Sequence, residues 1–190
     1  MNSKIDLTET ILETPRLYIR PWSYTDLDDF YEYASVDGVG QMAGWKPHDS
    51  KEESRQLLKL FIEEKKTLAL ELKENGKVIG SLGIEEYDEN KFSGDFEQKK
   101  GRELGYVLSK SYWGKGLMPE AVKRVINYCF DVLSLEFLTA GHFMWNEQSK
   151  RVIEKCGFKF YSKEEYVTRM GVVEWITLYA LLTTKALNLS

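Results

Sequence analysis

The chain has 190 residues, of which 43% are hydrophobic and 29% are charged, and its formal net charge is -4. A chain of this length and composition buries one substantial core, so we expect a single domain over residues 1–190 and exclude a disordered chain. The acidic balance, with a pI of about 5.4, argues against direct binding of nucleic acid, which requires a surplus of positive charge.

The cysteines and the amino terminus bear on metal binding and location. Cys129 and Cys156 have neither a CxxC spacing nor a nearby histidine pair, so we expect no metal site and no disulfide framework. The first residues lack the apolar core of a signal peptide, and no later stretch is long and apolar enough to span a bilayer. We therefore expect a cytoplasmic protein without a membrane partner.

The first half of the sequence predicts a strand, two helices and a hairpin. Residues 16–22 alternate apolar and polar side chains up to Pro21, which is typical of a strand. Thr25 and Asp26 are expected to cap a first helix, and Ser50 with Glu53 forms a capping box for a second. Asn75-Gly76 separates two strand-like runs and predicts an antiparallel hairpin, with a loop following it.

The second half predicts a strand, a long helix, a strand, a short helix and two final strands. Six apolar residues follow one face of the long helix, and Asn146 or Ser149 opens the short helix, which Gly157 ends. The predicted strands are residues 67–72, 77–87, 103–108, 136–143, 158–168 and 171–182, and the long helix is residues 117–133. This order predicts an α+β fold with a mixed sheet.

The segment from Ser111 to Leu117 (SYWGKGL) has the composition of an anion site between a strand and a helix. Gly114 and Gly116 permit a tight turn that exposes successive amides at the positive end of the helix dipole. A GxG alone also suits an ordinary strand-to-helix turn. The segment is neither a Walker loop nor a GxGxxG fingerprint, because Pro119 stands where the third glycine would be.

Three stretches together resemble one enzyme superfamily. The runs ETPRLYIRPW, ELGYVLSKSYWGKGLMPEA and NEQSKRVIEKCGF are similar to the GNAT superfamily of acyl-CoA N-acyltransferases, and within it to the ribosomal-protein-alanine N-acetyltransferase branch, over nearly all 190 residues. The resemblance implies a single domain whose mixed, mainly antiparallel sheet of about seven strands is flanked by about four helices. Two central strands would splay to form an acyl-CoA cleft, with acetyl-CoA as co-substrate and no metal.

The resemblance also implies a set of cofactor contacts. Backbone amides of the turn would hold the CoA pyrophosphate, an amide near the end of the preceding strand would stabilise the oxyanion, and the start of the short helix would contact the cofactor arm. Helix capping is an alternative role for the last two residues of the set. The implied set is Leu108, Lys110, Trp113, Gly114, Lys115, Gly116, Asn146 and Ser149.

Two positions depart from the superfamily pattern. Ser111 stands where many members have Gln or Arg, which removes a side chain but keeps the backbone amides. Ile153 stands where many members have the Tyr that protonates the leaving thiolate. That role passes to Ser149, to water or to no group at all.

Attack on a thioester requires a neutral amine, so a carboxylate near the cleft is the expected base. Glu103 is the preferred candidate, since it begins the strand that leads to the turn and resembles a base used by some members; a cross-strand ion pair is the structural alternative. Glu85 is the second candidate, because strand alternation sends only one of Glu85 and Glu86 toward the cleft. His142 is expected to pack or to form a strand-end hydrogen bond.

The expected function is transfer of acetyl from acetyl-CoA to a primary amine, by direct attack in a ternary complex. The acceptor is a protein N-terminus or a small amine, and the protein is a monomer or a homodimer. Trp22, Trp45, Tyr87 and Trp145 are candidates for an acceptor pocket, although aromatic residues of this kind also build cores. A non-catalytic acyl-CoA sensor and a ribosome-associated module are the alternatives.

Overall fold

The computed structural model describes residues 1–183, which form an α+β domain. In the described part, four α-helices and one eight-stranded sheet are joined by turns and short 3-10 segments. The helices are α1 (Leu27–Ala34), α2 (Lys51–Glu64), α3 (Leu117–Asp131) and α4 (Glu147–Lys155). The strands are β1 (Leu12–Glu13), β2 (Leu17–Pro21), β3 (Thr67–Leu72), β4 (Val78–Glu85), β5 (Gly101–Leu108), β6 (Phe137–Phe143), β7 (Lys159–Val167) and β8 (Val173–Leu182).

The mixed sheet follows the predicted order with one additional strand. Its spatial order is β1-β2-β3-β4-β5-β6-β8-β7, and only β5 and β6 are parallel. The eighth strand is β1, whose two residues pair with β2 and are too few for an alternating pattern to be recognised in sequence. The hairpin at Asn75-Gly76 is confirmed, with Gly76 at a φ of 72°.

Two helix caps differ from the sequence expectation. The chain enters α1 through a 3-10 turn capped by Ser23, and the Asp26 carboxylate accepts the Ser23 amide at 2.8 Å, so the capping box lies there and not at Thr25. At α2, the Ser50 hydroxyl accepts from the Glu53 amide as predicted, but the Glu53 carboxylate accepts from the amide of Asp49. The capping residues in the sequence located both helix starts correctly, but the residues that form the capping hydrogen bonds lie one or two positions from those expected.

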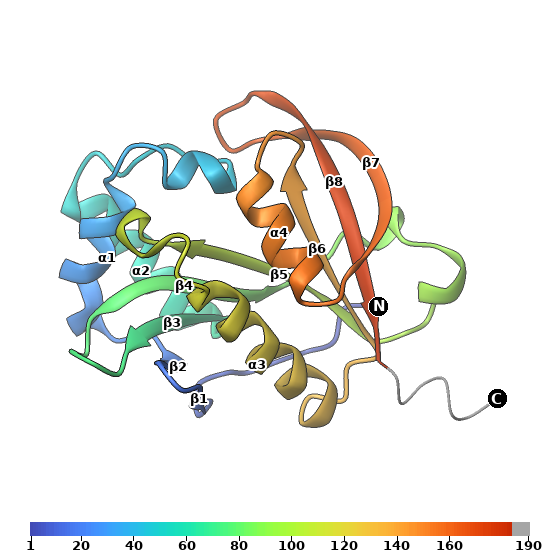
Figure 1. Cartoon of the computed structure of the whole chain (residues 1–190), viewed down its shortest axis with the longest axis horizontal. Coiled ribbons are helices and arrows are strands. Elements are labelled where there is room, and N and C mark those ends of the chain that lie inside the picture. The colour runs from blue at the N-terminus through green and yellow to red at the C-terminus, as the bar shows by residue number, and fades with distance from the viewer. Residues whose placement is uncertain (184–190) are drawn as a thin grey trace.

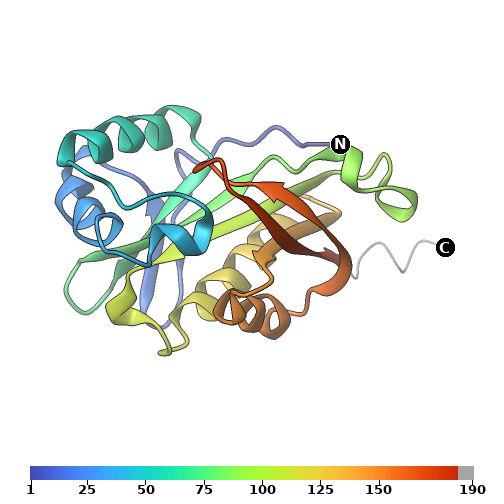
Figure 2. The same cartoon turned by 90° about the horizontal axis from the view of Figure 1, so that it is seen from above.

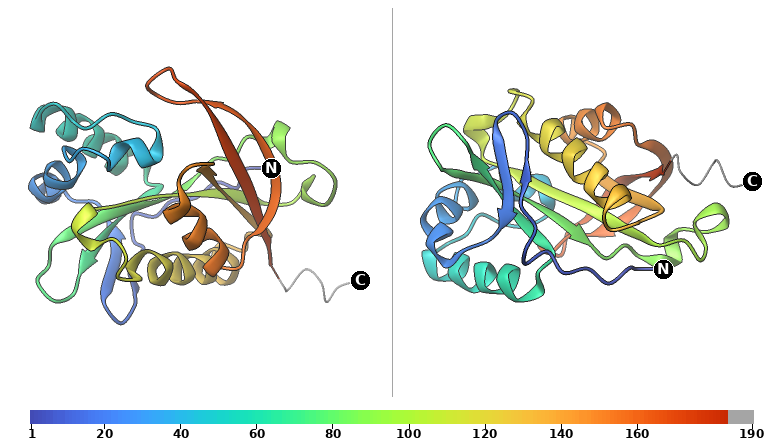
Figure 3. Two further views of the ribbon diagram at one scale, coloured as in Figure 1. Left: turned by 45° about the horizontal axis from the view of Figure 1, so that its top comes forward. Right: turned by 90° about the horizontal axis from the view of Figure 1, so that it is seen from below.

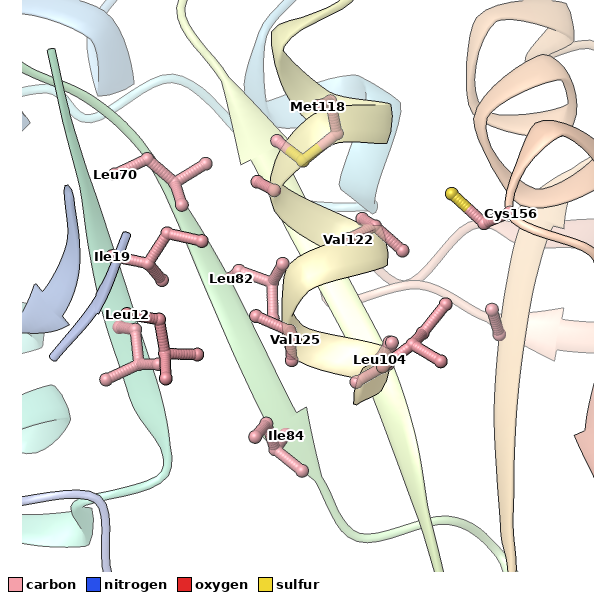
Figure 4. Close-up of a cluster of buried hydrophobic side chains, with 14 of the residues drawn as sticks. Leu12, Ile19, Leu70, Leu82, Ile84, Leu104, Met118, Val122, Val125 and Cys156 are labelled. Carbon is pink, nitrogen blue, oxygen red and sulfur yellow. The ribbon is translucent and has the colours of Figure 1, made fainter. Parts of the chain in front are cut away.

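The helices cover opposite faces of the sheet. Figures 1 and 2 show α1 and α2 on one face and α3 and α4 on the other. The predicted apolar face of α3 is buried, and Figure 4 shows Met118, Val122 and Val125 directed toward sheet residues that include Leu82 and Leu104. Burying a side chain of this size stabilises the fold by about 1.5–3 kcal/mol.

The splay between β5 and β6 is the feature that positions the site. The two strands pair only through Gly101–Glu103 and Phe137–Thr139. Beyond these residues β5 stays paired with β4 alone, and β6 continues along β8. Figures 1 and 3 show β5 and β6 running apart toward their carboxyl ends, which confirms the expected opening.

The β7–β8 hairpin reaches back over the opening. The amide of Arg169 at its tip donates to the carbonyl of Gly44 at 3.1 Å, next to the 3-10 turn Gly40–Ala43. Gly157, with a φ of 90°, ends α4 and starts the path into the hairpin, as its sequence position predicts. Within residues 1–183 no helix is both long and apolar enough to cross a membrane.

Candidate active site

The turn between β5 and α3 has the geometry of an anion site. Gly114 and Gly116 both adopt a φ of 75°, the left-handed region that glycine enters without strain. Gly116 is the N-cap of α3 and supplies no side-chain acceptor to the first helical amides. A β-carbon at Gly114 would meet no atom within 4 Å, so space lies open beside the turn. Amides at the positive end of a helix facing open space suit a phosphate group.

Two side chains brace this turn. The Trp113 indole donates from Nε1 to the carbonyl of Leu108 at 2.7 Å, which ties the turn to the end of β5. Arg16 donates to the carbonyl of Lys115 at 2.9 Å and pairs with Glu120 at 2.7 Å, so the loop is also held from the start of β2. These contacts fix the turn before any ligand arrives, which lowers the entropic cost of binding.

A cleft of about 380 Å³ opens from the turn along the splay. Its walls are the end of β5 from Tyr106 to Leu108, the turn, the first residues of α3, and one face of α4. On α4, Arg151 and Lys155 lie one helical turn apart and both line the cleft. The cleft therefore combines an amide-lined end with two cationic side chains.

The start of α4 is fixed by Asn146. Its side-chain oxygen accepts the Ser149 amide at 3.0 Å, and its side-chain nitrogen donates to the carbonyl of Met42 at 3.1 Å. Asn146 is buried, so both bonds are shielded from water. Ser149 is thereby placed at the cleft, where its hydroxyl lies 2.9 Å from the hydroxyl of Tyr106 on β5.

A second pocket of about 420 Å³ adjoins the cleft. Glu103, Gly105 and His142 contribute to its wall, together with apolar side chains from β6 and β8. The loop after β4 adds the charged residues Glu86, Asp88 and Lys91 and the ring of Phe92. Three residues line both hollows, namely Met42, Tyr106 and Ser149. The two hollows thus meet beside these three residues.

Glu103 is a partly buried residue whose carboxyl lies in the second pocket. Burial raises its pKa from 4.5 to about 7, and the negative charges of Glu85 and Glu164 add to that rise, whereas Lys91 and the Thr139 hydroxyl oppose it. Lys91 is itself paired with Glu164 at 2.6 Å. A carboxyl with a pKa near 7 exchanges protons readily at neutral pH, which is what a general base requires.

Comparison with known proteins identifies the family. The model of the acetyltransferase (GNAT) domain matches residues 16–159. The chain belongs to the GNAT acetyltransferase family. It is 27% identical over 154 residues to the Bacillus subtilis N-acetyltransferase YoaA, itself named as uncharacterised. The matched region covers 78% of this chain and 82% of YoaA.

Solved structures share the whole GNAT fold. A GNAT-family acetyltransferase from Bacillus anthracis superposes with a TM-score of 0.79 at 21% identity, covering 91% of this chain and 98% of that one. A putative ribosomal-protein-serine acetyltransferase from Vibrio cholerae gives 0.75 at 17% identity, covering 93% and 99%. At these identities the likeness concerns the fold. Together with the family match, it makes this chain an acetyl-CoA-dependent acyltransferase.

Most of the GNAT cofactor residues predicted from sequence lie along the cleft. Leu108, Trp113, Gly114, Gly116, Asn146 and Ser149 all line it. Two lysines do not belong to that lining. The Lys110 ammonium donates to the carbonyl of Asp37, and the Lys115 ammonium lies 4.9 Å from the centre of the Tyr112 ring.

The two candidate bases are separated by their neighbours. Glu103 and Glu85 are cross-strand partners on β5 and β4, so their side chains leave the same face of the sheet. Glu103 lines the second pocket. Glu85 pairs with Lys66 at 3.0 Å and accepts from the Thr67 hydroxyl at 3.1 Å, outside that lining.

His142 has a structural partner, and the four aromatic candidates lie outside both hollows. The Nδ1 atom of His142 lies 2.7 Å from the carbonyl of Phe143, which is the expected strand-end hydrogen bond, although its ring also reaches the second pocket. Neither hollow is lined by any of the four aromatic residues that were considered for the acceptor pocket: Trp22, Trp45, Tyr87 and Trp145.

Sequence reasoning missed four residues of the site. Arg151 and Lys155 could have been found from their i,i+4 spacing in a helix already expected to face the cofactor. Tyr106 lies two residues before Leu108 on the same strand and so shares its face. Met42 comes from a four-residue 3-10 turn, which is too short to give a periodic signal.

Proposed function

We propose that this enzyme transfers an acetyl group from acetyl-CoA to a primary amine, which attacks the thioester directly in a ternary complex. The observation that carries the proposal is the junction of the two hollows at Tyr106 and Ser149. One hollow has the features of a CoA site and the other holds a carboxyl suited to accept a proton. A thioester carbonyl at their junction is accessible from both.

The cleft supports the donor assignment through three kinds of group. The amides around Gly114 and Gly116 suit the pyrophosphate, and the cations of Arg151 and Lys155 suit the remaining phosphate of CoA. Beyond Glu103, β5 has no β6 partner, so the edge facing the splay offers backbone groups to the amides of pantetheine. An amide near Leu108 is the proposed donor to the tetrahedral oxyanion.

The second pocket supports the acceptor assignment. Glu103 takes the proton of the attacking amine, directly or through a water molecule, because its pKa of about 7 matches the task. Burial of the carboxyl lowers the local dielectric constant, which strengthens its interaction with an ammonium group. An amine thus enters as a cation that Glu103 attracts, and it becomes the neutral nucleophile there.

Ser149 is the group of this chain best placed at the leaving sulfur. It lines both hollows at the start of α4. Ile153, one turn later on the same helix, is 1% exposed and packs in the core, so it provides no hydroxyl. We assign to Ser149 the hydrogen bond to the departing thiolate.

The acceptor class is proposed as a protein N-terminus or a small amine. The name of the Vibrio cholerae neighbour, a ribosomal-protein-serine acetyltransferase, favours N-terminal peptides as the first substrates to test. The second pocket is lined in part by Tyr166, Ile176 and Leu178 of the β7–β8 hairpin, which an N-terminal peptide would contact as it enters.

The test is release of free CoA from acetyl-CoA against a panel of N-terminal peptides and small amines, with thermal shift by acetyl-CoA measured in parallel. In the wild type, we expect acetyl-CoA to stabilise the protein and free CoA to be released with one class of acceptor. In Glu103→Gln, we expect the release of CoA to be lost and the stabilisation by acetyl-CoA to remain. Stabilisation without release for any amine favours the acyl-CoA sensor. Absence of both contradicts the donor site at the turn.

A further inference from the structure

Among residues 1–183, Tyr106 is the one tyrosine that lines both hollows. Its hydroxyl lies 2.9 Å from the Ser149 hydroxyl and 3.2 Å from the Ser149 carbonyl, and its ring lines both the cleft and the second pocket. It comes from β5, on the opposite side of the opening from α4. β5 therefore provides a phenol beside Ser149, where α4 offers none at Ile153.

We propose, resting on the acetyl transfer proposed above, that Tyr106 positions the Ser149 hydroxyl toward the leaving sulfur by donating its own hydrogen to the Ser149 oxygen. The two hydroxyls then form a chain that ends on the sulfur. A serine oxygen that accepts a hydrogen bond is a stronger donor through its own hydrogen, because hydrogen bonds in a chain polarise one another. Tyr106 is a positioning residue, and Ser149 is the group that contacts the sulfur.

The environment of Tyr106 makes it a hydrogen-bond donor and not an acid. Burial raises the pKa of its phenol above the ordinary value of 10, and the bond to Ser149 opposes this only in part. The other titratable neighbour is Cys156 at the end of α4, and burial raises the pKa of that thiol to about 11, so it is uncharged near neutral pH. A thiol with a reference pKa of about 8.5 is too weak a base, as its thiolate, to deprotonate this phenol.

The transfer balances without a proton from Tyr106. Glu103 first takes a proton from the ammonium group and passes it to solvent. The neutral amine nitrogen then forms its bond to the acetyl carbon and loses its second proton to Glu103. The carbon–sulfur bond breaks, and the sulfur leaves with the electron pair as a thiolate held by the Ser149 hydroxyl. The thiolate takes a proton from solvent, and Glu103 returns its proton to solvent, so the products are the amide and free CoA.

The backbone around Ser149 is held by Asn146 as well as by the contact of the Tyr106 hydroxyl with the Ser149 carbonyl. Asn146 accepts the Ser149 amide and anchors the helix start to Met42. Loss of the phenol hydroxyl therefore leaves the start of α4 in place but lets the Ser149 hydroxyl rotate. Tyr106→Phe thus changes the orientation of the Ser149 hydroxyl hydrogen without moving the helix.

The experiment measures the affinity for CoA relative to desulfo-CoA, from about pH 6 to about pH 9, in the wild type, Tyr106→Phe, Ser149→Ala and the double variant. Desulfo-CoA lacks only the thiol, so the ratio cancels the pH response of Arg151, Lys155 and every other group. Tyr128→Phe is the matched control. It also removes a phenol hydroxyl, which lies 2.9 Å from the Thr10 hydroxyl, and neither residue lines either hollow.

The wild type is expected to hold the thiolate, so that the affinity ratio rises with pH below the pKa of the free thiol. Each single variant should raise the pKa of the bound thiol by about one pH unit and reduce the rise about tenfold, and the double variant should match the singles, because Tyr106 acts through Ser149. Tyr128→Phe should behave as wild type. With an acceptor in hand, Tyr106→Phe should lower kcat about tenfold at an unchanged KM for acetyl-CoA.

Three results overturn the inference. If Tyr106→Phe keeps the wild-type ratio of CoA to desulfo-CoA affinity while Ser149→Ala lowers it, Tyr106 has only a structural role. Additive effects in the double variant show two independent contacts, and no effect in either single variant removes the pair from the sulfur. Failure of the wild type to bind CoA at all overturns the proposed function itself, which these binding data distinguish from the failures above.

Discussion

At Glu103, burial and neighbouring carboxylates act in the same direction on a single group. Burial removes hydration from the Glu103 carboxylate, and the negative charge of Glu85, its partner across the strand pair, repels it. Both effects disfavour the ionised form. A structural role would favour a stable ion pair, whereas this carboxyl is kept near the point where both protonation states are populated at neutral pH. Such a group is costly to keep, which is typical of a functional position.

The pH dependence of turnover should report Glu103. In the wild type, kcat/KM is expected to rise as the pH passes through about 7, because only the deprotonated carboxyl accepts the proton of the amine. Glu103→Gln should lower kcat about a hundredfold or more and remove this limb, while acetyl-CoA affinity stays unchanged. An unaltered pH–rate profile in the variant, measured by thiol release, would return Glu103 to a structural role.

The same substitution should stabilise the protein at alkaline pH. Between an unfolded pKa of about 4.5 and a folded pKa of about 7, the folded state holds the extra proton, so the free energy of unfolding falls as pH rises through this window. Above about pH 7 the penalty is fully present and amounts to roughly 3 kcal/mol. Urea unfolding should therefore find Glu103→Gln more stable than wild type at about pH 8 and equal near pH 4. Equal stability at both values contradicts the raised pKa.

At the scale of the elements, the β5–α3 turn and the β3–β4 hairpin turn each contain a glycine with a positive φ, but only the glycine of the β5–α3 turn lies at the cleft. Gly114 and Gly76 have φ values of 75° and 72°, and a β-carbon would meet nothing within 4 Å at either. The two positions are therefore equivalent in strain and in space. They differ in what the amide faces, since only Gly114 lines the cleft.

This equivalence provides a matched pair of variants. Proline requires a φ near -65° and has no amide hydrogen, so Gly114→Pro and Gly76→Pro should both destabilise the fold, and Gly76→Pro more so, because it also removes the 2.8 Å bond from the Gly76 amide to the Leu72 carbonyl. Only Gly114→Pro should weaken acetyl-CoA binding, by about tenfold to a hundredfold, because it removes an amide from a charged ligand. Calorimetric titration of both folded variants decides the matter, and equal affinities would remove the turn from the donor site.

Gly105 offers a test of the second pocket from the middle of β5. It lines that pocket and not the cleft, and a β-carbon there would meet no atom within 4 Å. Gly105→Leu should fill the acceptor space and raise the acceptor KM by about tenfold or more, with acetyl-CoA affinity held within about twofold. Gly105→Ala should have a smaller effect, since one methyl group leaves most of the space. Loss of acetyl-CoA affinity in Gly105→Leu would mean that donor and acceptor pockets are assigned wrongly.

For the whole molecule, the sequence predicted what depends on local pattern and missed what depends on the splay. Helical and strand periods, the Asn-Gly turn and the glycines before α3 are local, and the structure has each of them. Tyr106 gains its partner only because β5 leaves β6 after Glu103 and α4 fills the opening. Likewise, the separation of Glu103 from Glu85 depends on Lys66 and Lys91, which approach from distant elements. No window of sequence contains such contacts.

The three-residue pairing of β5 with β6 makes the site the main break in an otherwise continuous sheet, and a bound donor should couple its two sides. Acetyl-CoA would contact the turn and β5 on one side and α4 on the other. At about 100 times its Kd it should stabilise the folded state by roughly 2.7 kcal/mol. Hydrogen exchange should slow both at the turn before α3 and at the start of α4, and α2, none of whose residues lines the cleft, serves as the internal control. Protection confined to the turn would show that α4 takes no part in binding the donor, and equal protection of α2 would show general tightening in place of a bridge across the cleft.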